Sequence, residues 1–154
     1  MAARAHRRAG TRGFTLLELL CVIAIIGLVA GISMAALGRP ADRVRLETAA
    51  RQLADALRLS RAAAVMRNAP VALTIDAEAR TFESAAISPQ HIDGDIAVRL
   101  TIAEPERLGP ARGGFRFFAD GSSTGGEVLL ALRGREARIC VNWLSGAARQ
   151  AARC

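Results

Sequence analysis

The chain has 154 residues and a formal net charge of +7, with 21 basic residues (all of them arginine) against 14 acidic ones. After Gly38 it is long enough for one small hydrophobic core and not for two. Its two histidines, His6 and His91, are isolated, so no nucleophile, base and orienting group can be assembled. We therefore expect no enzyme, no metal site and no cofactor.

A basic segment precedes a long apolar run. The first 13 residues contain no acid and four arginines: Arg4, Arg7, Arg8 and Arg12. From Leu19 to Gly38 the chain has 20 residues without a charge. A helix of that length is about 30 Å long, which is enough to cross the core of a bilayer. The sequence predicts a transmembrane helix over residues 14–38.

Two details distinguish this segment from a secretory signal peptide. The small residue that could mark a cleavage site, Gly13, precedes the apolar run, whereas a signal peptidase site would follow it. Glu18 lies near the start of the run, and a carboxylate inside a membrane helix costs about 2.5–3.5 kcal/mol at the helix centre. Such a residue usually has a partner.

The segment Gly13-Phe14-Thr15-Leu16-Leu17-Glu18 resembles the class III leader of type IV pilins and type II secretion pseudopilins. The resemblance implies that residues 1–13 are a leader and that a prepilin peptidase cleaves between Gly13 and Phe14. The same enzyme would N-methylate Phe14. It also implies a single-pass protein of the inner membrane, with its N-terminus in the cytoplasm and its C-terminal domain in the periplasm.

After the apolar run, Gly38-Arg39-Pro40 predicts a kink or local break, because proline lacks the backbone donor that a helix interior needs. Helical periodicity then resumes, and residues 39–67 read as an amphipathic periplasmic half of the helix. One apolar stripe, interrupted by Ser60, consists of Leu46, Ala50, Leu53, Leu57 and Ala64. The segment Asn68-Ala69-Pro70 predicts the end of the helix.

From residue 68 to 154 the apolar period changes from helical to alternating, which predicts a head of short strands. The predicted strands are Val71–Ile75, Thr81–Ala85, Ile96–Ile102, Phe115–Phe118, Val128–Leu132 and Ala137–Leu144. The predicted loops are Ser88–His91, Asp93–Asp95 and Glu104–Gly114. The fold class is therefore α+β and pilin-like, with a long N-terminal helix packed on a small antiparallel β head.

The chain has three cysteines. Cys21 falls in the apolar helix, where it is expected to act as a small hydrophobic residue. Cys140 and Cys154 would both face an oxidising compartment, which permits a disulfide between them. The spacing is compatible with a closed loop, but the geometry that decides the bond is not visible in the sequence.

A second resemblance lies in the predicted head. The stretch from Phe117 to Gly126, which contains Asp-Gly-Ser-Ser, and the stretch Val141-Asn142-Trp143-Leu144-Ser145-Gly146 resemble the H-type minor pseudopilins of the GspH/FimT domain family. Ser145 replaces the usual threonine of that family. The arginine expected directly after the glycine is missing, since Ala147 and Ala148 precede Arg149.

This resemblance implies a structural subunit near the tip of a periplasmic pseudopilus, which helps to export folded proteins across the outer membrane. Its partners would be the other minor pseudopilins, the major pseudopilin and the secretion machinery. In the assembled filament the apolar helices would form a central bundle. Glu18 would then be neutralised by the amino terminus of a neighbouring subunit, because an unpaired carboxylate is costly at low dielectric.

The alternative is a minor type IV pilin, FimT/FimU-like, that serves pilus biogenesis or DNA uptake. Its support is a local excess of arginines, since phosphate binding needs clustered positive charge. From Leu129 to Cys154 the only acid is Glu136, and the arginines are Arg133, Arg135, Arg138, Arg149 and Arg153. From residue 68 onward arginines and acids balance, and the Trp-Leu-Ser-Gly ending favours secretion. We therefore expect little binding of nucleic acid.

Two further motifs have simpler explanations. The glycine-rich segment Asp120–Gly126 lacks the Gly-Lys-Ser/Thr ending of a phosphate-binding loop, so a connecting loop is expected. The two carboxylates of Asp93-Gly94-Asp95 do not supply the six to eight oxygen ligands of calcium, so a turn is expected there.

Overall fold

The computed structural model describes the backbone of residues 15–154 and the side chains of residues 15–28 and 41–154. The chain divides into two compact units, Met1–Gly38 and Arg39–Cys154. One helix, α1 (Leu16–Arg67), is followed by eight strands and a short 3-10 helix, η1 (Glu104–Glu106). The strands are β1 (Val71–Asp76), β2 (Thr81–Ser84), β3 (Ile87–His91), β4 (Ala97–Ile102), β5 (Arg112–Phe117), β6 (Gly126–Leu132), β7 (Arg135–Val141) and β8 (Ala148–Gln150).

Helix α1 is continuous over 52 residues, so the local break predicted at Pro40 is wrong, while the alternative of a kink stays a prediction. A proline removes one backbone hydrogen bond, and helical bonding resumes beyond it. The predicted end of the helix is confirmed. Asn68 adopts a left-handed conformation with φ of 48°, and the Ala69 N–H donates to the Ala64 carbonyl at 3.2 Å. This is the Schellman arrangement that ends many helices, and Pro70 follows it.

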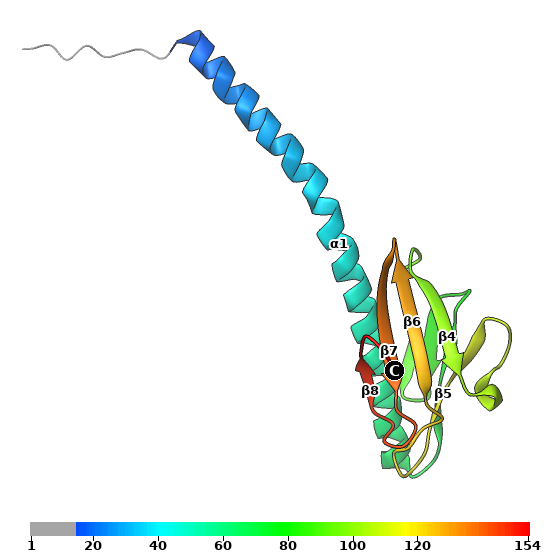
Figure 1. Ribbon diagram of the computed structural model, residues 1–154. Coiled ribbons are helices and arrows are strands. Elements are labelled where there is room, and N and C mark those ends of the chain that lie inside the picture. The colour runs from blue at the N-terminus through cyan, green and yellow to red at the C-terminus, as the bar shows by residue number, and fades with distance from the viewer. Residues whose placement is uncertain (1–14) are drawn as a thin grey trace, which may run out of the picture. The chain divides into compact units, whose positions relative to one another are not determined.

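The strands form two antiparallel sheets, with the orders β3-β2-β1-β5 and β4-β6-β7-β8. The part of α1 from residue 41 onward runs alongside β7 and β8 (Figure 1). There the Arg58 Nε donates to the Ala148 carbonyl of β8 at 3.2 Å. The predicted α+β, pilin-like fold class is confirmed.

One hydrophobic core joins α1 to both sheets. On the helix, the buried residues are Leu46, Ala49, Ala50, Leu53, Ala54, Ala56, Leu57, Ser60 and Ala64. The largest buried side chains of the sheets are Leu73, Ile75, Phe115, Phe117, Leu130, Leu132 and Ile139. The predicted stripe is therefore confirmed, and it is wider than the sequence indicated because alanines flank it.

The sequence suggested that Ser60 interrupts the stripe, and this is wrong. It is fully buried within it. Its hydroxyl donates to the Ala56 carbonyl at 2.9 Å and lies 2.9 Å from the Ser84 hydroxyl of β2. A buried hydroxyl is tolerated when its hydrogen bonds are satisfied, so Ser60 forms a polar link between the helix and the first sheet.

Four strands differ from the sequence prediction by three residues or more. Strand β7 ends at Val141, three residues before the predicted Leu144, because a turn begins at Asn142. Residues 88–91 belong to strand β3, although Pro89 favoured a loop; β3 is an edge strand, where a missing donor is tolerated. Strand β5 begins at Arg112, inside the predicted loop Glu104–Gly114. Its Gly114 lies so close to β1 that a Cβ there would overlap the Leu73 carbonyl oxygen. Strand β8 was not predicted.

The segment before β5 is held by an ion pair between a buried carboxylate and a partly exposed arginine. Glu106, at the end of η1, is only 7 % exposed. Its two carboxylate oxygens accept hydrogen bonds from Arg116 of β5, from Nε at 2.8 Å and from Nη2 at 3.1 Å. Bidentate Arg–carboxylate pairs are directional as well as strong, so this pair positions the long connection against the sheet.

Cys140 of β7 and Cys154 at the C-terminus are joined by a disulfide, with a Cα–Cα distance of 5.3 Å. The bond ties the last residues of the chain, which follow β8, back to the centre of the second sheet. Cys21 is a free and exposed cysteine of α1.

We predict that the double change Cys140→Ser and Cys154→Ser lowers the free energy of unfolding by up to about 3 kcal/mol, because a loop of this length is no longer closed in the unfolded chain. Urea unfolding followed by the fluorescence of Trp143, the only tryptophan of the chain, measures the change. Cys21→Ser is the control and should not shift the midpoint. Equal midpoints for all three proteins would contradict the prediction.

Candidate functional site

The predicted processing site, Gly13 and Phe14, lies outside the described residues, which begin at the start of α1. There the Thr15 hydroxyl accepts a hydrogen bond from the Glu18 N–H at 3.2 Å. Thr15 is thus an N-cap, with a glutamate three residues later and near the positive end of the helix dipole. The Thr-x-x-Glu pattern signals such a cap, but the sequence analysis had assigned Glu18 to assembly alone.

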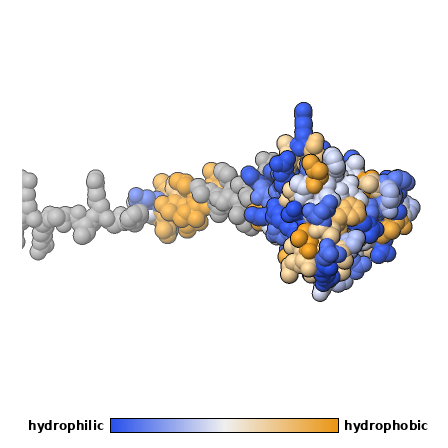
Figure 2. Space-filling model, turned by 90° about the horizontal axis from the view of Figure 1, so that it is seen from below, coloured by the Kyte–Doolittle hydropathy of each residue, from blue (hydrophilic) through white to orange (hydrophobic). Residues whose placement is uncertain are grey.

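The start of α1 presents apolar side chains on its surface. Each of these residues is more than two-fifths exposed: Leu16, Leu17, Leu19, Leu20, Val22, Ile23, Ile25, Ile26 and Leu28. They form the orange segment in Figure 2. Among the described side chains, no helix has an apolar stretch of the length that a bilayer crossing needs. The side chains of residues 29–38, the second part of the predicted span, lie outside the described ones.

Two turns meet at the end of the head where β5 and β7 finish. In the first, the Asp120 carboxylate accepts hydrogen bonds from the Ser122 hydroxyl at 2.6 Å and from the Ser122 N–H at 2.9 Å. These bonds favour the ionised carboxylate, so they lower the pKa of Asp120 below its ordinary value. In the second turn, the Asn142 side-chain oxygen accepts the N–H groups of Leu144 and Ser145, at 3.0 and 2.9 Å. Both are Asx-type turns.

Ser123 joins the two turns. Its hydroxyl donates to the Asn142 carbonyl at 3.1 Å, and its N–H donates to the Trp143 carbonyl at 2.8 Å. Ser123 is buried, and these bonds satisfy its polar groups. The Asp-Gly-Ser-Ser and Trp-Leu-Ser-Gly segments, which are far apart in the sequence, therefore form one structural unit.

Arg61 of α1 fastens this unit to the helix. Its Nε donates to the Gly121 carbonyl at 2.9 Å. Gly146 has a φ of 61°, and a Cβ there would overlap the Gly121 carbonyl oxygen and come within 3.0 Å of the Arg61 side chain. The sequence analysis expected a loop at Asp120–Gly126, but its predicted strand Ala137–Leu144 wrongly continued through the second turn, since β7 ends at Val141. It did not identify Arg61, because nothing in a helical pattern indicates which surface arginine reaches a distant carbonyl.

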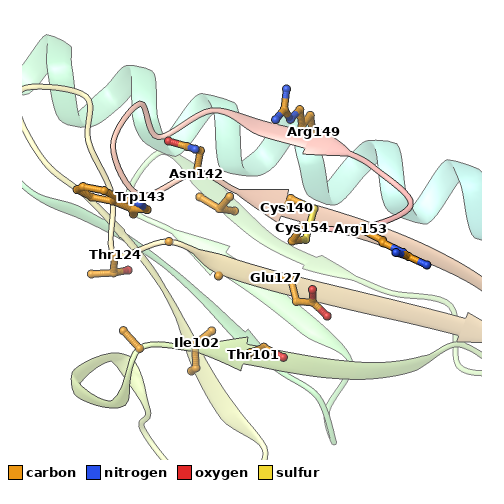
Figure 3. Close-up of a pocket in the computed structure, with 14 residues that line it drawn as sticks. Thr101, Ile102, Thr124, Glu127, Cys140, Asn142, Trp143, Arg149, Arg153 and Cys154 are labelled. Carbon is orange, nitrogen blue, oxygen red and sulfur yellow. A yellow bond between two sulfur atoms is a disulfide. The ribbon is translucent and has the colours of Figure 1, made fainter.

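A groove of about 550 Å³ lies beside the second turn, on the outer face of the β4-β6-β7-β8 sheet. Figure 3 shows Trp143 at one end, Arg153 toward the other and the disulfide between them. Thr101, Glu127 and Arg149 also line this groove. We call it the outer-face groove. The sequence analysis named several of these residues but did not place them together.

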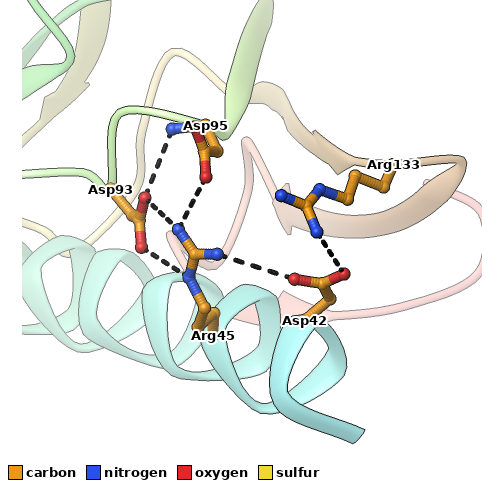
Figure 4. A network of polar contacts seen from close by, with 5 residues as sticks. All are labelled: Asp42, Arg45, Asp93, Asp95 and Arg133. Atoms are coloured by element: carbon orange, nitrogen blue, oxygen red, sulfur yellow. Dashed lines mark hydrogen bonds and ion pairs between the residues drawn. The ribbon is translucent and has the colours of Figure 1, made fainter. Parts of the chain in front are cut away.

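The carboxylates of the Asp93–Asp95 turn, which the sequence analysis examined as a possible calcium site, bind an arginine of α1 (Figure 4). Arg45 of α1 donates to the two carboxylate oxygens of Asp93 from Nε at 2.8 Å and from Nη2 at 2.7 Å, and Nη2 also reaches Asp95 at 3.0 Å. The hydrogen bonds from Arg45 lower the pKa of Asp93 below its ordinary value. Asp42 links this cluster to Arg133, at 3.2 Å.

The turn thus attaches the head to α1. Within the described residues, no group of three or more His, Cys, Asp or Glu side chains is arranged to hold a metal ion.

Two sequence families match the chain over regions that fit this structure. The model described as "Type II transport protein GspH" matches residues 49–146, from the buried half of α1 to the end of the second turn. The chain belongs to the GspH family. The model described as "Prokaryotic N-terminal methylation motif" matches residues 8–34 of this GspH-family protein.

The sequence relatives include a type II secretion protein and a pilin-like protein. The chain is 34% identical over 142 residues to type II secretion system protein H of Xanthomonas campestris pv. campestris, which covers 92% of this chain and 84% of the relative. It is 42% identical over 67 residues to pilin-like protein PilA1 of Thermus thermophilus, which covers 44% of this chain and 42% of the relative.

Solved structures share the fold. The minor pseudopilin EpsH of Vibrio cholerae has a TM-score of 0.56 at 12% identity, covering 70% of this chain and 97% of its own. The type IV minor pilin FimU of Pseudomonas aeruginosa has a TM-score of 0.57 at 13% identity, covering 71% and 90%. At such identities the likeness concerns the fold alone, and it is equal for a secretion and a pilus protein.

We predict that Gly146→Ala destabilises this GspH-family protein more than Gly134→Ala does. Both glycines have a positive φ, 61° and 79°, so alanine meets a similar backbone cost of about 1–2 kcal/mol at either position. Only at Gly146 does the added Cβ also overlap a carbonyl oxygen, whereas the space around Gly134 is open. The difference between the two free energies of unfolding therefore isolates the contact between the turns, and equal values would show that the turns are not tightly packed.

Proposed function

We propose that this protein is a minor pseudopilin of a type II secretion pseudopilus, a structural subunit close to the tip that helps to export folded proteins across the outer membrane. The observation that carries the proposal is the combination of an N-terminal methylation motif at residues 8–34 and a GspH domain at residues 49–146 in one chain. The relative that matches over most of both chains is a type II secretion protein. The family is structural, and we propose no enzymatic role.

The proposed location is the inner membrane, with one membrane-spanning helix, a cytoplasmic N-terminus and a periplasmic head. The exposed apolar side chains at the start of α1 support an apolar environment for that segment. The disulfide of the head supports an oxidising compartment for the C-terminus. The other pseudopilins, the prepilin peptidase and the secretion machinery are the proposed partners.

In the proposed filament, Glu18 pairs with the methylated amino terminus of an adjacent subunit. Two opposite charges about 4 Å apart interact far more strongly in a low-dielectric helix bundle than in water. A single buried carboxylate without that partner would be strongly unfavourable. The Thr15 cap bonds the backbone N–H of Glu18 and leaves its carboxylate available to this second role.

The proposed processing predicts that Gly13→Val leaves a full-length, unmethylated precursor, because a branched side chain replaces the residue before the cleaved bond. Mass spectrometry of the purified protein measures it. Gly10→Val, which alters a glycine three residues earlier in the leader, is the matched control and should still yield a chain that begins at methylated Phe14. A mature chain with any other first residue would refute the leader assignment.

We further predict that Glu18→Leu leaves cleavage and membrane insertion intact but reduces crosslinking to neighbouring pseudopilins, and secretion, at least tenfold. Glu18→Gln should share the defect, because it keeps the shape and removes the charge.

Thr15→Ala is the control for the capping role of this turn. It removes the hydrogen bond to the Glu18 N–H without changing the carboxylate, so assembly should be close to normal. If Thr15→Ala were as defective as Glu18→Leu, the defect would come from the start of the helix and not from a charge pair between subunits.

A second candidate is a minor type IV pilin, favoured by the fold shared with FimU. It is less well supported, because the named relative that covers most of the chain belongs to a secretion system. The neighbouring genes distinguish the two: a secretion operon supports the proposal, and a pilus or competence locus supports the alternative.

A further inference from the structure

The outer-face groove has one apolar, rigid end. Trp143 is 66% exposed although it is the largest side chain of the chain, and Leu144 beside it is 69% exposed. Their backbone is held by Asn142 and Ser123, as described above. A Cβ at Gly125 would come within 2.8 Å of the Trp143 Cβ, so the residue before β6 packs closely against the base of the tryptophan. An exposed aromatic residue on a rigid turn is typical of a binding surface.

The charges of the groove are unbalanced. Among the described residues, Arg149 and Arg153 have no ion-pair partner. Glu127 is the only acidic side chain of the lining, and it already pairs with Arg138 at 3.4 Å. The two exposed arginines are therefore available to pair with acidic groups of an occupant.

The groove also borders the helix. Arg149 lies on β8, whose Ala148 carbonyl is bonded by Arg58 of α1. A subunit that packs against this part of α1 would thus lie close to the rim of the groove. This step rests on the proposed function, in which pseudopilins assemble through their N-terminal helices.

We propose that the outer-face groove binds an extended acidic segment of a neighbouring pseudopilin, with an apolar side chain against Trp143 and carboxylates against Arg149 and Arg153. The strand register places Arg149 opposite Cys140. Cys140 precedes Trp143 by three residues, which span at most about 10 Å in an extended chain. In such a chain the side chains at i, i+2 and i+4 share one face. The recognised segment therefore has an apolar residue followed at alternate positions by acids.

Nucleic acid fits the groove less well. Its binding depends on many phosphate contacts, whereas the groove offers two free arginines beside the carboxylate of Glu127. The mainly apolar lining around Trp143 and the disulfide also favours a peptide, which can supply an apolar side chain.

The first test uses the fluorescence of Trp143, the only tryptophan, in the full-length protein held in phosphatidylcholine nanodiscs. The probe is the blocked peptide Phe-Ser-Asp-Ser-Glu-Ser, and its neutral partner has Asn and Gln in place of the acids. The acidic peptide should change the emission saturably and bind at least tenfold more tightly than the neutral one.

The double variant Arg149→Gln with Arg153→Gln should lose at least tenfold in affinity for the acidic peptide. The matched control, Arg51→Gln with Arg135→Gln, removes the same charge elsewhere and should bind within twofold of the original protein. Equal binding of the two peptides, unchanged affinity of the groove variant, or tighter binding of a single-stranded DNA oligonucleotide than of the acidic peptide would each overturn the proposal.

The second test identifies the occupant in cells. A photo-crosslinking benzoylphenylalanine at Thr101, an exposed residue of the groove, should capture another pseudopilin through an acidic segment, and Arg149→Gln with Arg153→Gln should abolish the product. Glu78, on the turn between β1 and β2, is the control position. Equal products at both positions, or capture of a secreted protein alone, would overturn the proposal. The peptide titration uses isolated protein, so failure of the groove and failure of the proposed filament give different results.

Discussion

The head depends on one contact, the burial of a stripe of α1 beneath both sheets. The stripe is rich in alanine, and Ala50, Leu53, Leu57 and Ala64 are at most marginally accessible to water. Small side chains allow a helix backbone to approach a sheet closely, and the large residues Phe115 and Phe117 then fill the space from the opposite side. A sheet pair of this size would expose its apolar faces without that helix. The same continuous helix therefore acts as the core of the head and, in the proposed function, as its membrane anchor.

Arginines on the helix fasten the head at both ends of this stripe. Arg45 binds the Asp93–Asp95 turn at one end, and at the other end Arg61 donates a hydrogen bond to the carbonyl of Gly121, in the turn that follows β5. The two segments by which the sequence resembles the GspH family meet at the second of these points, where Ser123 bonds both turns. Their conspicuous glycines and hydroxyl groups thus have a structural explanation, since they let two turns and a helix come together without a steric clash.

The fold alone does not separate a secretion subunit from a pilus subunit, since EpsH and FimU resemble it equally. A common fold frequently carries different functions, which are decided by surface sites. In this protein the most distinctive surface feature is the outer-face groove, which is lined by an exposed tryptophan and two arginines. If the groove recognises an acidic segment, the choice of neighbours would be made by the head, while the helices supply the general affinity of the filament.

The sequence by itself determined the features that depend on local chemistry. The leader motif, the helical stripe, the helix end at Asn68 and most strands follow from periodicity and from residues with special backbone preferences. Only the tertiary structure decided the features that depend on distant neighbours. Pro89 is accepted because β3 lies at a sheet edge, Ser60 is buried because Ser84 of β2 meets its hydroxyl, and Gly114 belongs to a strand because β1 passes close to it. The groove is of the same kind, because Trp143, Arg149 and Arg153 come to line one surface only when β7, β8 and the disulfide bring them together.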